Sequence, residues 1–164
     1  CGYGDWDGRA DPGAGRMTNE GTQASGVPVG VGELLLPVPE PDSQPFWDAL
    51  LSEELRIQRC TACGELRHPP QPMCPRCNDF EHEWALMSGR GSVFSYVVSH
   101  QAVHPSLRER TPFVTVLVEL DEGPRLVSNL VDVPPDEVEI GMAVEVVFHR
   151  VDAEIVLPLF RRVG

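Results

Sequence analysis

The spacing of four cysteines constrains the fold of this chain more than any other feature. Cys60 and Cys63 form one Cys-x-x-Cys pair, and Cys74 and Cys77 form a second pair after ten intervening residues. Two thiolates separated by two residues can hold one metal ion from a tight turn, and four complete the tetrahedron of a closed structural zinc site. Gly64 permits the first turn and directs backbone N–H groups toward the sulfurs. The spacing therefore predicts one metal site, with a small hairpin through residues 66–70.

Other uses of these cysteines are weaker interpretations. Iron can occupy the same four sulfurs. Two disulfides would require an oxidising compartment, and redox Cys-x-x-Cys motifs use a single pair near a βαβ unit. We therefore expect zinc. Because a closed tetrahedron has no position for water or substrate, we expect the metal to stabilise the fold and not to catalyse a reaction.

Composition excludes several classes of function. The net charge is -12, and all 13 basic residues are Arg, so lysine Schiff-base and P-loop chemistry are excluded. An acidic chain is poorly suited to phosphate backbones, so we expect no nucleic-acid partner. No apolar run is long enough to cross a membrane and no secretory signal is visible, which predicts a cytoplasmic location.

The first 40 residues, rich in Gly and Pro, predict a tail or linker without a folded element. Cys1 is expected to be an unpaired tail thiol, and the chain is either cut from a longer protein or naturally begins at Met17. A short helix should follow, capped by Asp42 or Ser43 with Pro45 in its first turn. Its apolar stripe, which packs on the protein body or docks a partner, consists of Phe46, Trp47, Leu50 and Leu51.

A strand at residues 55–59 should lead into the first cysteine pair, and the pattern after Trp84 is that of a β-domain. Alternating, β-branched and aromatic residues predict strands at 92–98, 113–120, 125–131, 143–148 and 154–160. Turn residues at 121–124, 134–135 and 141 separate several of them. Five short strands without a strong helix predict a mainly β protein with a small OB-type barrel, closed or partly open.

No catalytic constellation is predicted. His100 and His104, with Glu109 nearby, could act in acid–base chemistry, but histidines at strand ends are mostly exposed or bonded to the backbone. The alternative function is an OB-fold nucleic-acid binder in which Phe94 and Tyr96 stack on bases. A free-standing enzyme is disfavoured because the cysteines are used by the metal.

The motifs in combination resemble those of the DUF35 family across residues 42–162. The residues that carry the resemblance are Phe46-Trp47, Gln58-Arg59-Cys60, Cys63-Gly64, Pro69-Pro70, Cys74-Pro75, Cys77, Glu83-Trp84, Ser88-Gly89, Gly91, Val93, Ser95-Tyr96, Glu119 to Gly123, Ile140 to Met142, Leu157-Pro158 and Phe160. The resemblance implies a rubredoxin-like zinc ribbon joined to an OB-fold. The expected organisation is a tail or linker at 1–40, a helix and zinc ribbon at 41–88, and an OB-fold at 89–164.

The resemblance also implies a supporting role beside a thiolase-like acyl-CoA enzyme. We expect an accessory subunit, without activity alone, of a complex with two copies of each chain. The reaction implied is a retro-aldol cleavage in steroid side-chain degradation. The most exposed-looking docking candidates are Phe46, Trp47, Pro69, Pro70 and Pro72. Arg59 and Arg90 are candidates for contacting CoA phosphates, although pairing with local carboxylates is the favoured alternative.

Overall fold

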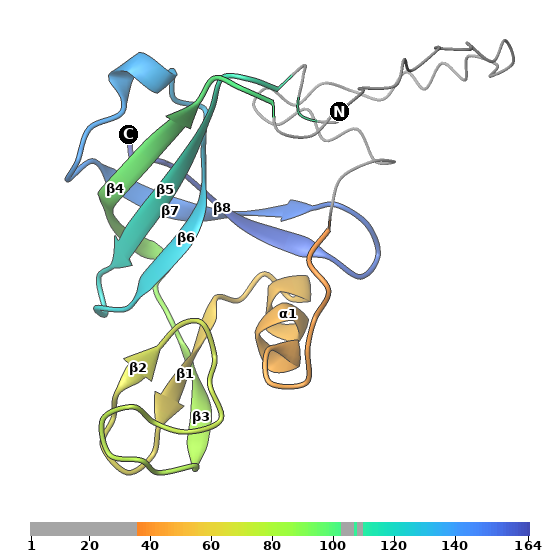
Figure 1. Ribbon diagram of the computed structural model, residues 1–164, viewed down its shortest axis with the longest axis vertical. Coiled ribbons are helices and arrows are strands. Elements are labelled where there is room, and N and C mark those ends of the chain that lie inside the picture. The colour runs from red at the N-terminus through yellow and green to blue at the C-terminus, as the bar shows by residue number, and fades with distance from the viewer. Residues whose placement is uncertain (1–35, 103–106, 108–109) are drawn as a thin grey trace, which may run out of the picture.

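A computed structural model describes residues 36–102, 107 and 110–164 of the chain. A short helix, α1 (Gln44–Leu51), precedes a ribbon of three strands, β1 (Arg56–Cys60), β2 (Leu66–Arg67) and β3 (His82–Leu86). The barrel follows, and its elements are β4 (Arg90–Ser99), β5 (Phe113–Leu120), β6 (Arg125–Val131), the 3-10 turn η2 (Pro135–Glu137), β7 (Ala143–Arg150) and β8 (Val156–Arg162). Figure 1 shows the ribbon and the barrel at opposite ends, with α1 beside the ribbon and below β8.

Helix α1 begins where the sequence predicts. Ser43 occupies the N-cap position and Pro45 lies in the first turn, although the Ser43 hydroxyl bonds to the backbone of Glu40 and not to the helix. Phe46 and Leu50 are buried, while Trp47 and Leu51 pack partly against the same core. The apolar stripe therefore packs on the body of the protein.

The ribbon sheet has the order β2-β1-β3, so β1 lies in the centre. Strand β1 pairs with β3 from Arg56 opposite Leu86 to Cys60 opposite His82. Strand β3 was not predicted from the sequence. Of the hairpin predicted at residues 66–70, only Leu66 and Arg67 form a strand, and they pair with β1 across the turn at residues 61–65, while residues 68–70 lie in no strand. The buried Arg67 holds the loop that follows β2, because its Nε donates to Gln58 Oε1 at 2.6 Å and its guanidinium also donates to Gln71 O.

The barrel is closed in the order β4-β5-β6-β8-β7, which confirms the predicted five-stranded OB-type architecture. Strand β5 shows why the strands could be predicted from the sequence: its residues alternate without exception between buried and partly exposed positions. A bulge between Val93 and Ser95 shifts the register of β4 against β5. The closing contact is a short parallel pairing of β6 with β8.

Two details explain where the barrel departs from the predicted boundaries. Strand β8 begins at Val156, two residues later than predicted, because Asp152 Oδ1 accepts hydrogen bonds from the backbone N–H groups of Glu154 and Ile155 and holds them in a turn. Strand β4 begins at Arg90, two residues earlier than predicted. A Cβ at Gly91 would clash with the carbonyl oxygen of Glu119, so a glycine at this position lets β4 pair closely with β5.

Over the described residues, no helix has the length and apolar character needed to cross a membrane.

Candidate metal centre and the groove between ribbon and barrel

The ribbon brings the four predicted cysteines together. Cys60 Sγ lies 3.5 Å from Cys77 Sγ, and Cys63 Sγ lies 3.6 Å from Cys74 Sγ. All four sulfurs lie within 4.8 Å of one another. A tetrahedron with metal–sulfur bonds of about 2.3 Å has edges of about 3.8 Å. The four thiols therefore fit a single tetrahedral metal ion.

The two turns that present the sulfurs have the same backbone design. Gly64 N–H donates to Cys60 O and Asn78 N–H donates to Cys74 O, each at 2.9 Å. The residue directly after the second cysteine has a positive φ in both turns, 75° at Gly64 and 61° at Asn78. Asn is among the few side chains that tolerate this left-handed conformation. The role of Gly64 was predicted from the sequence, but that of Asn78, which occupies the equivalent position in the second pair, was not.

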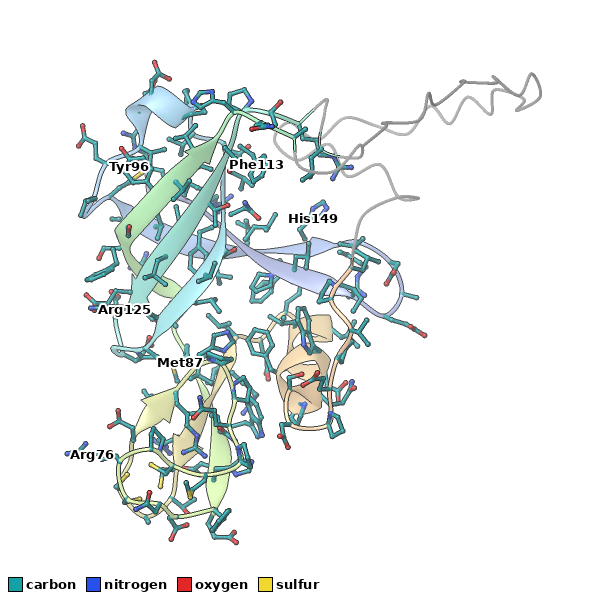
Figure 2. The ribbon with its side chains drawn as sticks, in the orientation of Figure 1. Arg76, Met87, Tyr96, Phe113, Arg125 and His149 are labelled. Carbon is teal, nitrogen blue, oxygen red and sulfur yellow. The ribbon has the colours of Figure 1, made fainter. Side chains whose placement is uncertain are left out.

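These turns favour ionised thiols at the first cysteine of each pair. The backbone N–H of Cys63 lowers the pKa of Cys60, more than burial raises it. Burial raises the pKa of the Cys74 thiol, but the N–H groups of Cys77 and Arg76 outweigh it and lower that pKa to about 6. Four adjacent thiols cannot all ionise without a cation, and a divalent metal supplies that charge. The donor set is thus that of a closed metal site, with Arg76 projecting outward beside it (Figure 2).

A second feature is an open groove of about 440 Å³ where the ribbon and α1 meet the barrel. Its walls come from four parts of the chain that are distant in sequence. They are the segment from Val38 to Trp47, residues 68–70 of the ribbon loop, residues 126–129 of β6 and residues 157–159 of β8. Met87, which is buried and labelled in Figure 2, lies in the connection between the ribbon and the barrel.

His68 has an unusual position on the ribbon side of this groove. Its ring packs against that of Phe46, tilted by 47°, with 4.9 Å between the ring centroids. Burial lowers the pKa of His68 to about 4, so the imidazole is neutral at physiological pH. Its Nδ1 atom is buried and forms no hydrogen bond within the described part of the chain. The ribbon wall of the groove is therefore uncharged.

The predicted docking residues are only partly exposed. Phe46 is 4% exposed, so the expectation that it is an accessible anchor is wrong: its ring is packed into the core that α1 shares with the barrel. Trp47 and Pro70 are partly exposed, whereas Pro69 and Pro72 are exposed. All of these except Pro72 line the groove.

The two arginine candidates for CoA phosphates behave differently. Arg59 Nε donates to Glu83 Oε1 at 2.7 Å across the β1–β3 pair, so the local-carboxylate alternative is confirmed for this residue. Arg90 is exposed, and its guanidinium forms no ion pair with any residue that the structure describes. Of these two arginines, Arg90 is therefore the one whose guanidinium is accessible and without an ion pair to a described residue.

The paired stacking platform of the nucleic-acid alternative is not formed. Phe94 is 41% exposed but is covered by Arg125, whose guanidinium carbon lies 3.4 Å from the ring centroid. Tyr96 instead packs partly against the barrel core. His100 is exposed just beyond the end of β4, while His104, Glu109 and Cys1 lie outside the described residues.

Comparisons with known proteins match both halves of the described chain. Residues 47–83 match the ChsH2 rubredoxin-like zinc ribbon domain, and residues 84–149 match the ChsH2 C-terminal OB-fold domain. The chain is 48% identical over 117 residues to a probable enoyl-CoA hydratase alpha subunit of Thermomonospora curvata. It is 42% identical over 116 residues to the 3-oxo-4,17-pregnadiene-20-carboxyl-CoA hydratase alpha subunit of Mycobacterium tuberculosis. These matches cover 71% and 70% of this chain but only 36% of each relative, so the chain spans about a third of their length.

Two further matches cover most of the relative. A DUF35 domain-containing scaffold protein of Methanothermobacter thermautotrophicus is 37% identical over 97 residues, which are 58% of this chain and 72% of that protein. A solved chain of the Ltp2-ChsH2(DUF35) aldolase superimposes with a TM-score of 0.72 at 44% identity, over 77% of this chain and 98% of that one. A zinc-ribbon half, an OB-fold half and these relatives lead to one conclusion: this chain belongs to the DUF35 family.

Proposed function

We propose that this chain is an accessory subunit of a thiolase-like acyl-CoA enzyme, with a zinc ion held by Cys60, Cys63, Cys74 and Cys77. The observation that carries this proposal is the 44% identity to essentially the whole of a chain in the Ltp2-ChsH2(DUF35) aldolase. The relatives named as scaffold proteins support the same kind of role. The reaction proposed for the complex is a retro-aldol cleavage in the degradation of a steroid side chain.

The zinc ion has a structural part in this proposal. Its four sulfur ligands come from both turns of the ribbon, so the ion would fix the loop between them, which includes Pro69 and Pro70 of the groove wall. No step of the reaction is assigned to it, and we propose that the base is supplied by the partner. The proposed units are a tail at 1–40, the helix and ribbon at 41–88 and the barrel at 89–164.

One exposed arginine supports docking beside a CoA-binding entrance of the complex. Arg90 has an accessible guanidinium, which suits a phosphate or a carboxylate of the partner. Arg59 makes a matched control, because its guanidinium is already paired with Glu83. In the complex, Arg90→Ala should raise KM for the acyl-CoA substrate severalfold while Arg59→Ala leaves KM unchanged.

Co-expression with the Ltp2 protein tests the proposal directly. The expected result in size-exclusion chromatography with light scattering is one complex whose mass corresponds to two copies of each chain. Aldolase activity should appear in the complex and be absent from this chain alone. Separate elution of the two proteins at micromolar concentration, with substrate present, would refute the accessory role, and full activity of the isolated chain would refute the proposed division of labour.

A further inference from the structure

The groove between ribbon and barrel is unsuited to an anion. Among the residues that the structure describes, Glu40 is the one charged residue on its walls, and no described arginine lines it although the chain is rich in arginine. A phosphate placed there would lose its hydration and gain no counter-charge, while Glu40 would repel it. The groove therefore does not suit the nucleotide end of a CoA ester.

The polar side chains on the walls are mostly occupied within the protein. The Ser43 hydroxyl donates to Glu40 O, and the Ser128 hydroxyl donates to Pro158 O. Asn129 Nδ2 donates to Val114 O and to Thr115 Oγ1. His68 is neutral, and although its Nδ1 has no partner among the described residues, that atom is buried. The groove therefore presents little that a polar occupant could bind and much that an apolar one could cover.

The many ring-bearing side chains of the walls favour a rigid occupant. Six of the lining residues carry rings: Phe46, Trp47, His68, Pro69, Pro70 and Pro158. Rigid walls and a rigid ligand both lose little conformational entropy when they come together. A volume of about 440 Å³ lies within the usual range for small-molecule sites, about 300–1,000 Å³, and junctions between domains are common places for them.

We infer that this groove binds the uncharged, apolar ring system of the acyl group, while the CoA part of the substrate lies outside it. The inference rests on the proposed function, because only an acyl-CoA enzyme would bring such a group to this subunit. In the complex, the groove would hold the rings against the β6 and β8 walls and leave the thioester to the partner's active site.

The test uses the full chain alone in equilibrium dialysis against radiolabelled progesterone, an uncharged steroid. Val127 and Val38 line the groove and are 66% and 84% exposed, so Val127→Arg and Val38→Arg place a charge there without disturbing the core. Val97→Arg is the matched control, since Val97 is a strand valine of the same barrel, 62% exposed and outside the groove. Circular dichroism and bound zinc verify the fold of each variant.

We expect saturable binding of one progesterone per chain, at least tenfold weaker in both groove variants and unchanged in the control. Free CoA at millimolar concentration should not displace the steroid. Uptake that does not saturate, an equal loss in the Val97 variant, or displacement by CoA would overturn the inference. Because the assay contains no partner, these outcomes are independent of complex formation. A complex that forms with Ltp2 while the chain binds no steroid would leave the accessory role intact and remove only the groove assignment.

Discussion

Leu50 and Leu51 are adjacent leucines of α1 whose different burial makes a stringent test of how the helix packs. Leu50 is 0% exposed, whereas Leu51 is partly exposed. Leu50→Ala removes three buried carbons, a transfer cost of about 2.4 kcal/mol at about 0.8 kcal/mol per carbon. The cavity that remains between α1, β1 and β8 adds to this, so we expect a loss of about 3 kcal/mol. Leu51→Ala should cost about 1 kcal/mol, because part of its side chain is already in contact with water.

Urea unfolding of both variants, with the zinc concentration held constant, measures this difference. A gap of about 2 kcal/mol with a slope of about 1.5 kcal/mol/M separates the two midpoints by about 1.3 M. The change in helix propensity is the same in both variants and cancels from the comparison. The two slopes must agree for the midpoints to be compared.

Equal losses in the two variants would refute the packing described for α1. A larger loss for Leu51 would mean that the helix is rotated, with the opposite side of its apolar stripe against the barrel. Either result would also reopen the interpretation of the stripe as an anchor for a partner.

Three further predictions concern the metal centre, the groove and the barrel. Cys74→Ser should abolish binding of one zinc per chain and unfold the ribbon, while Cys1→Ser keeps the full zinc content, as elemental analysis and circular dichroism would show. Because burial lowers the pKa of His68 to about 4, below the 6.5 of an unfolded histidine, the unfolded chain binds more protons and stability should fall by about 2 kcal/mol from pH 7 to pH 5. His68→Phe should remove this contribution to the fall in stability between pH 7 and pH 5, as urea unfolding at the two pH values would show. A fall of the same size in the variant would contradict this assignment. Gly91→Ala should destabilise the barrel by about 1–3 kcal/mol in thermal unfolding, because the added Cβ meets a backbone carbonyl and not a flexible side chain.

The parts of the fold that could be predicted from the sequence are those whose causes are local. Strands β5 and β6 both have the predicted bounds. In β5 one face is buried along the whole strand, so its sequence pattern follows the pleat directly, whereas β6 alternates less regularly and its last two residues are both buried. The metal site could also be predicted because its cause is local: two ligands three residues apart must lie in one turn. Strand β3 was missed because His82, Glu83 and Trp84 show no apolar alternation, and only the neighbouring β1 makes this segment a strand.

The groove could not be predicted, because no local pattern encodes it. It exists only where residues 38–47, 68–70, 126–129 and 157–159 meet. The exposure of Phe46 was misjudged for a related reason: an aromatic residue on a short helix suits an interface as well as a core. Likewise, the sequence could not show that Glu83 lies opposite Arg59, because that pairing depends on the register of β1 and β3.

The barrel closure has a consequence for exchange of its backbone amides with solvent. Strands β6 and β8 pair in parallel at Leu130 with Phe160 and at Val131 with Arg161, whereas β4 and β5 pair from Gly91 to Ser99. Local opening costs less where fewer contacts are broken, so the β6–β8 contact should open more readily than the long β4–β5 pairing. A molecule that touches both strands binds only the closed barrel and, by linkage, makes that opening rarer. Protection of the backbone amides of the β6–β8 pairing against deuterium exchange would then report whether the groove between ribbon and barrel is filled.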